Sequence, residues 1–373
     1  MASGSYGLWG AEHILPAQRW KKLLTVAALA LLGVVVAAYM APTILPVAGS
    51  TGAKVSDRVY PAALVQSIDE PTDDAWTTPA AAVAVGDATF VLDTGNNRVL
   101  KLGPNRRVLA AFGPQLDGGA ALQMPMAIAT DGRSLFIANS SASSILVVDL
   151  SGQVEQVLSL PAGTSGKAAR PIGVALLPDG GIVASDADND QVLRLDAQGN
   201  VVWIAGTGTR DGGEIGFNVP AALATDAAGD VYVADILNAR VVELSPNGEF
   251  VRQFGQRGDT AGFLSRPKGV AVDAEGRVFV SDGLLAAVEV FAKDGSYLGL
   301  IGRREPRKVN STTLFIAPAG LFMTKDALIV TDRYAGVLTF DLTGTRPAIV
   351  PALRTPAPLP QTPQPAAPHA HPS

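Results

Sequence analysis

The sequence contains no cysteine and only three histidines among its 373 residues. Without cysteine there can be no disulfide, cysteine-ligated zinc, iron–sulfur cluster or thiol catalysis. The histidines lie near the ends of the chain, at His13, His369 and His371. A histidine-ligated zinc site or a Ser–His–Asp triad is therefore excluded from the central region. Two histidines on a proline-rich tail form no defined metal site, so we expect neither a metal nor a cofactor.

Aromatic residues and long basic stretches are also scarce. Aromatics make up 6% of the chain, and the net charge is −5 with both signs mixed along the sequence. A groove for nucleic acid is disfavoured by this pattern, so we expect no nucleic-acid partner. Glycine (39) and proline (26) are abundant instead. A long chain rich in turn residues indicates many short strands and an all-β domain.

One long uncharged stretch lies near the N-terminus. It begins at Leu23, is strongly apolar to Met40, and carries no charge until Lys54. About 20 apolar residues span the hydrocarbon core as a helix, at ~1.5 Å per residue. Basic residues precede this stretch at Arg19, Lys21 and Lys22. The positive-inside rule then places residues 1–22 in the cytoplasm and the rest of the chain outside.

We therefore predict a single-pass signal anchor over residues 23–45 of a cytoplasmic (inner) membrane, followed by a linker over 46–57. The domain beyond it would be periplasmic or otherwise extracytoplasmic. A cleaved signal peptide, cut after Val36-Ala37-Ala38, is the alternative, but the apolar segment and the region before it are long for one. Dense proline over residues 351–373 predicts an extended, disordered tail.

Residues 58–350 contain six repeats, each beginning with a proline. The six prolines are separated by 46, 46, 49, 47 and 51 residues, and they are Pro79, Pro125, Pro171, Pro220, Pro267 and Pro318. The fifth repeat predicts an inner strand from Gly269 to Asp273, then strands at Val278 to Asp282 and Val288 to Phe291, and a fourth running into Gly302. Asp–Gly and Asn–Gly pairs between third and fourth strands are strong hairpin turns. Four strands per repeat predict a six-bladed β-propeller of four-stranded blades.

Four phrases within these repeats are distinctive. They are Pro-x-Gly-Val-Ala-Val-Asp from Pro267, Val-Tyr-Val-Ala-Asp from Val231, Asp-Thr-Gly-Asn-Asn-Arg-Val from Asp93 and Phe-Val-Arg-Gln-Phe-Gly from Phe250. In sequence, these motifs resemble the NHL repeat family of β-propellers, and the resemblance extends over about residues 58–350. In related propellers the N-terminal strand often completes the last blade, so residues 58–68 compete with 346–350 for that place.

An aspartate ends the second strand in five of the six repeats. These residues are Asp93, Asp186, Asp235, Asp282 and Asp332, and Asn139 takes the place in the second repeat. A ring of metal ligands is one interpretation. We favour a turn, because the same acid recurs in nearly every blade and aspartate accepts backbone N–H bonds from a following loop. For the same reason we expect Arg98 and Arg240 to pack or pair within their own blades.

Cations gather at irregular positions on one predicted face. That face is built from the loops after second strands and from the connections between blades, where function often resides. Its cations, with one tyrosine, are Arg257, Arg266, Lys268, Arg303, Arg304, Arg307, Lys308, Arg333 and Tyr334. This positive sector fits an acidic protein, a polysaccharide or lipid headgroups. A solvated rim, partly neutralised by Glu305 and Asp259, is the alternative.

Our leading hypothesis is a membrane-tethered scaffold without catalysis, whose loop face binds an envelope protein or an anionic polymer. One alternative is a divalent-cation-dependent hydrolase, lactonase or lyase of propeller type, which needs oxygen ligands converging from different blades. Peptidylglycine amidating lyases and streptogramin-type lyases share the architecture but rely on propeller histidines that this sequence lacks. A second alternative is a sensor ectodomain that works with a separate signalling partner.

Overall fold

The computed structural model describes residues 59–69, 75–163, 166–302 and 314–344. By its internal contacts the chain divides into two units, Met1–Ala53 and Lys54–Ser373, and every described residue belongs to the second. The predicted cytoplasmic segment 1–22, span 23–45 and tail 351–373 lie outside the described residues. Within the described ranges, no helix has both the length and the apolar character needed to cross a membrane.

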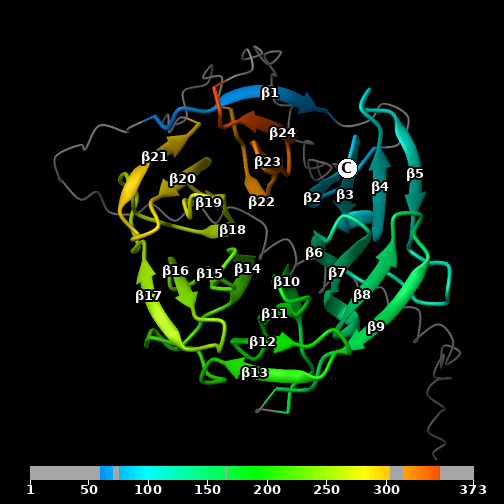
Figure 1. Cartoon of the computed structure of the whole chain (residues 1–373), viewed down its shortest axis with the longest axis horizontal. Coiled ribbons are helices and arrows are strands. Elements are labelled where there is room, and N and C mark those ends of the chain that lie inside the picture. Colours follow the sequence, from blue (N-terminus) through cyan, green and yellow to red (C-terminus); the bar gives the residue numbers. More distant parts are fainter. Residues whose placement is uncertain (1–58, 70–74, 164–165, 303–313, 345–373) are drawn as a thin grey trace, which may run out of the picture. The chain divides into compact units, whose positions relative to one another are not determined.

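The described residues form six antiparallel sheets of four strands each, arranged as blades around an axis (Figure 1). The first three blades are β2 (Pro79–Val85), β3 (Ala88–Asp93), β4 (Arg98–Leu102), β5 (Val108–Phe112); β6 (Pro125–Thr130), β7 (Ser134–Asn139), β8 (Ser144–Asp149), β9 (Val154–Ser159); and β10 (Pro171–Leu176), β11 (Ile182–Asp186), β12 (Gln191–Leu195), β13 (Val201–Ala205). Short 3₁₀ turns, η1 (Thr94–Asn96) and η2 (Ser140–Ala142), follow β3 and β7.

The other three blades repeat this order. They are β14 (Pro220–Thr225), β15 (Val231–Asp235), β16 (Arg240–Leu244), β17 (Phe250–Phe254); β18 (Pro267–Val272), β19 (Val278–Asp282), β20 (Ala287–Phe291), β21 (Tyr297–Ile301); and β22 (Pro318–Met323), β23 (Ala327–Asp332), β24 (Gly336–Asp341), β1 (Ala63–Ile68). The six-bladed propeller of four-stranded blades predicted from the sequence is confirmed.

Each repeat proline is the first residue of an inner strand, and it disturbs the pairing there. Proline has no N–H to donate to the ladder, so it is tolerated only at strand starts and bulges. The register shifts immediately after the proline in all six inner strands; in blade 5, Pro267 pairs with Asp282 and Gly269 with Ser281, which leaves Lys268 unpaired. The second residue of each inner strand is thus released from the regular alternation of side chains.

The inner strands approach one another too closely for larger residues at some points. A Cβ built on Gly173 would lie 2.0 Å from the carbonyl oxygen of Ala221 in the next blade, and one on Gly269 would lie 2.1 Å from that of Ala319. Serines on the neighbouring strand use the same carbonyls: Ser185 Oγ donates to Ala221 at 2.7 Å. The glycine of the Pro-x-Gly phrase is therefore a packing requirement of the ring.

The N-terminal strand closes the ring. β1 pairs with β24 as the outer strand of blade 6, from Ala63 opposite Asp341 to Ile68 opposite Val337. Leu64 and Ile68 are buried. This settles the choice left open by the sequence in favour of residues 63–68; residues 346–350 lie outside the described part of the chain. An otherwise unpaired edge of β24 is covered in this way.

The same segment also attaches to blade 5. Tyr60 donates its backbone N–H to the carbonyl of Leu300 at 2.8 Å, and its ring meets Phe279 edge to face at 5.8 Å between centroids. Residues 59–68 therefore contact the two final blades at once.

Candidate binding face

The loop face is the side of the ring where second strands end and inner strands begin. In every blade the inner-strand proline pairs with the residue that ends the second strand, as Pro79 does with Asp93 and Pro318 with Asp332. These two ends therefore lie side by side, together with the connection that arrives from the previous blade.

The strand-end aspartates tie that connection to the turn that follows. Asp282 accepts N–H bonds from Ser265 (2.7 Å) and Arg266 (2.8 Å) with one oxygen, and from Leu284 and Leu285 (3.0 Å each) with the other. Asp332 makes the same four bonds in blade 6, and Asp93, Asp186 and Asp235 accept N–H groups of their own connections. Each carboxylate faces the backbone of its own blade, as a turn former does.

Asn139 fills the same role in blade 2 with a different donor pattern. Its Oδ1 accepts from the N–H of Gln123 at 2.6 Å, and its Nδ2 donates to the carbonyl of Ala121 at 2.8 Å. An amide can replace the carboxylate here because the connection offers it both a donor and an acceptor.

Arg98 and Arg240 lie against the strand-end acids of their own blades. Arg98 Nε is 2.8 Å from Asp93, and Arg240 Nε is 3.0 Å from Asp235. Arg240 is buried and also donates to the carbonyls of Gly213 (2.9 Å) and Gly216 (2.5 Å). Burial raises the pKa of Asp235, and the hydrogen bonds that it accepts from Asn218, Asn238 and Arg240 oppose that rise. The geometry gives both arginines a local structural contact.

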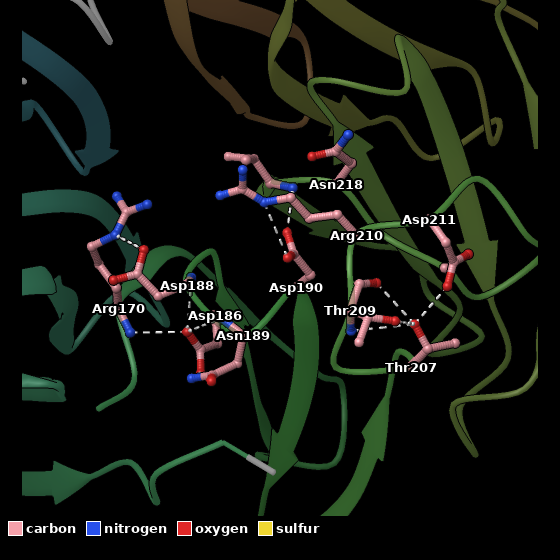
Figure 2. Close-up of polar contacts among 12 residues, drawn as sticks. Arg170, Asp186, Asp188, Asn189, Asp190, Thr207, Thr209, Arg210, Asp211 and Asn218 are labelled. Atoms are coloured by element: carbon pink, nitrogen blue, oxygen red, sulfur yellow. Dashed lines mark hydrogen bonds and ion pairs between the residues drawn. The ribbon is translucent and has the colours of Figure 1, made fainter. Parts of the chain in front are cut away.

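Blade 3 carries an acidic turn on the same face, shown in Figure 2. Arg170 donates its backbone N–H to Asp186 at 2.9 Å and pairs through Nε with Asp188 at 2.5 Å. Asp190 accepts the N–H of Val219 at 2.8 Å and lies 3.5 Å from Arg210 Nε. Each of the three aspartates in this turn is therefore hydrogen-bonded or ion-paired with a neighbouring residue. Sequence reasoning did not single it out, although three acids alternate over residues 186–190.

No group of three or more His, Cys, Asp or Glu residues with the geometry to hold a metal ion occurs in the part of the chain that the structure describes. The strand-end carboxylates of the loop face are instead hydrogen-bonded to the connections and turns of their own blades, and Asp190 bonds to Val219 before blade 4.

A polar cluster lies between blades 4 and 5 at the opposite end of the strands. Glu243 is buried, pairs across the sheet with Tyr232, and lies 3.0 Å from Arg252 Nε. Asp226 is 3.8 Å from Lys293 of the next blade. Burial raises the pKa of both Glu243 and Tyr232, more than Arg252 lowers them. This cluster joins two blades: the side chains of Glu243 and Asp226 are largely buried in it, whereas those of Arg252 and Lys293 reach the solvent.

The second residue after each strand-end acid divides the loop face in two. In blades 1 to 3 this residue is Gly95, Ser141 or Asp188. In blades 4 to 6 it is a large apolar residue with considerable exposure: Leu237 (36%), Leu284 (48%) and Tyr334 (55%). We call these three the apolar row. Sequence reasoning found Tyr334 but missed the two leucines, which an alignment of this one position across the blades would have shown.

Four of the predicted cations lie in the same three blades. Arg257 is exposed and donates to the carbonyl of Leu237, and the Arg333 guanidinium lies 5.4 Å from the centroid of the Tyr334 ring. Arg266 precedes β18 and Lys268 is its second residue. Arg303, Arg304, Arg307 and Lys308 lie outside the described residues. The apolar row is thus accompanied by positive charge.

Lys268 is the single charged residue in the six inner strands. Burial lowers the pKa of its ammonium first, Arg266 and Arg333 lower it further, and Asp282 and Asp332 oppose them. The rest of these strands consists of alanine, valine, glycine and other uncharged residues, with neither a carboxylate nor a histidine.

No family model matches the chain, and no curated protein matches it. Solved structures do. A putative gluconolactonase has a TM-score of 0.54 at 18% identity, over 76% of this chain and 94% of its own. Virginiamycin B lyase from Staphylococcus aureus, in a form made catalytically inactive by replacing a histidine with alanine, has 0.53 at 11%, over 74% and 98%.

A third structure has no assigned function. It comes from Bacteroides thetaiotaomicron, with a TM-score of 0.54 at 15% identity over 79% of this chain and 75% of its own. Identities this low carry the fold and nothing finer. The protein is a six-bladed β-propeller, similar in fold to structures that bear different functional names.

Proposed function

We propose that this protein is an NHL-type propeller that serves as a binding scaffold of the cell envelope. Its N-terminal segment tethers it to the cytoplasmic membrane, and the loop face of blades 4 to 6 binds an envelope protein or an anionic polymer. The observation that carries the proposal is the apolar row, Leu237, Leu284 and Tyr334, set beside cations in one half of the ring.

The composition of that half-face suits a partner better than solvent. Aromatic and arginine side chains are enriched in interface cores, and a few such residues, here Tyr334 with the neighbouring arginines, commonly contribute most of the binding energy. Each exposed apolar side chain gains about 25 cal/mol per Å² on burial by a partner. The equivalent positions of blades 1 to 3 are small or polar, so the ring's own packing does not require the larger residues.

The tether rests on the sequence. The uncharged stretch 23–45 follows three basic residues, which favours an outward-facing propeller held at the membrane. Tethering raises the effective concentration of the propeller for a partner in the same membrane, so that a modest contact is sufficient.

A propeller-type hydrolase or lyase remains the second candidate, because two fold neighbours bear the names of a lactonase and a lyase. Such chemistry needs carboxylates or histidines converging near the axis. The described inner strands hold a lysine and no such groups, which favours the scaffold.

The test is an affinity pull-down of the full-length protein from solubilised membranes. The variant combines Leu237→Ser, Leu284→Ser and Tyr334→Ser. The matched control is Leu109→Ser with Val202→Ser, which removes apolar side chains exposed by 60% and 54% on the outer strands β5 and β13. A partner captured by wild type and control but lost from the triple variant supports the proposal. A partner that the triple variant retains refutes the role of this face.

A further inference from the structure

We propose that Lys268 is the centre of an anion site on the loop face, between blades 5 and 6, which binds the phosphate of a phosphomonoester with an apolar body. This goes beyond the scaffold function: it concerns a small ligand rather than a macromolecular partner, and either proposal can fail without the other.

Lys268 holds an exceptional place in the ring. The second residues of the other inner strands, which occupy the same bulge, are Ala80, Met126, Ile172, Ala221 and Ala319. The side chain of Lys268 is partly buried, and its ammonium has no hydrogen bond or ion pair with any residue in the described ranges. Three N–H donors are left for a ligand. An anionic ligand would supply the acceptors that this ammonium can use.

The turn beside Lys268 leaves room for its side chain. A Cβ built on Gly283 would lie 3.2 Å from Lys268 Cε and 3.4 Å from the carbonyl oxygen of Pro318. The corresponding residue in blades 1, 2 and 6 is Thr94, Ser140 or Arg333. Glycine in blade 5 therefore lets the lysine lie across the turn, toward the start of β22 in blade 6.

The charges around the ammonium favour an anion. Arg266 and Arg333 both act on Lys268, and their positive charge lowers its pKa in addition to the effect of burial. The nearest acids are Asp282 and Asp332, but each already accepts four backbone N–H bonds. A bound anion would relieve the repulsion among the three cations without competing for these acids.

A phosphomonoester fits this site better than a carboxylate. A phosphate dianion offers more acceptor oxygens than a carboxylate, and charge-assisted bonds to lysine and arginine are the strong ones. Leu284 follows Gly283 directly and Tyr334 follows Arg333, and both are exposed. An alkyl or aryl group on the phosphate would lie against them, gaining about 0.8 kcal/mol per buried CH₂.

The test uses the full-length protein in a nonionic detergent, with its lysines reductively methylated with ¹³C. The Lys268 resonance is the one lost in Lys268→Met. We titrate with inorganic phosphate and with n-butyl phosphate at constant ionic strength. The control residue is Lys325, exposed in the hairpin between β22 and β23 at the far end of the blade. We expect a saturable shift of Lys268 and a rise in its pKa, with Lys325 unchanged.

Binding of both anions is then measured by calorimetry. Lys268→Met should weaken it by about tenfold or more, as the loss of a charge-assisted bond predicts. Lys268→Arg should retain most of it, and Lys325→Met should bind like wild type. Leu284→Ser should reduce the preference for butyl phosphate over phosphate. If neither anion shifts Lys268, or if Lys268→Met binds both like wild type, the site does not exist. Equal affinity for the two anions would overturn the apolar part of the ligand.

Discussion

The strand-end aspartates hold the loop face in place, and their contribution to the free energy of unfolding can be measured. Asp282 is fully buried and accepts four backbone N–H bonds between 2.7 and 3.0 Å. Asp282→Ala leaves all four donors without a partner. Single lost bonds to a charged group cost about 1.5–3 kcal/mol, and because water reaches part of the loop we expect about 3–5 kcal/mol in total.

Asp282→Asn should cost about half as much. One amide oxygen can still accept two of the N–H groups, whereas the NH₂ group faces the other two donors. Asn139 is tolerated in blade 2 because there the amide NH₂ finds the carbonyl of Ala121. The corresponding oxygen of Asp282 accepts only from N–H groups, so an asparagine at this position in blade 5 is expected to be destabilising.

The assay is urea unfolding of the full-length protein, with the free energy taken from the midpoint at an unchanged slope. The matched control is Asp294→Asn, an exposed turn aspartate that binds Ser296 in the same blade. An Asp282→Ala protein within about 1 kcal/mol of wild type, or an asparagine variant as unstable as the alanine one, would refute this account of the turn.

Two further predictions concern the ring and its pH dependence. Ile68→Ala, in the strand that closes the ring, should lower the free energy of unfolding by about 2–5 kcal/mol, while Val59→Ala, at an exposed site nearby, should change it little; equal effects would contradict the buried contact. Burial raises the folded pKa of Glu243 above the unfolded value near 4.5, so its ionisation costs stability progressively as pH rises from 4.5 through the folded pKa. Glu243→Gln should flatten that decline in a series of urea midpoints, and an unchanged pH profile would contradict it.

The sequence was most informative where the determinants are local. The strand Val278–Asp282 was predicted with its observed bounds, because alternating β-branched residues and the flanking turns lie within a few positions of one another. The inner strand of the same blade was predicted to follow the proline, from Gly269 to Asp273, whereas it is observed at Pro267–Val272 and begins with the proline itself.

The pairing of segments far apart in the chain could not be predicted from the sequence. The sequence offers two candidates for the outer strand of the last blade, residues 58–68 and 346–350. The pairing of β1 with β24, with Leu64 and Ile68 buried, decides in favour of the first. The apolar row was missed for a related reason: a single leucine in a turn is unremarkable in sequence, and its significance appears only when the exposure of Leu237 and Leu284 is compared with their counterparts.

Closure by β1 has a consequence for the order of biosynthesis. The strand ends at Ile68 and its partner β24 ends at Asp341, which is 341 − 68 = 273 residues later. At about 5–20 residues per second, a ribosome needs roughly 14 to 55 s to supply that partner. During this time the first strand made has no place in the sheet, while the blades between are completed in turn. The first strand to emerge is therefore among the last to be placed, and the ring stays open until synthesis of its final blade.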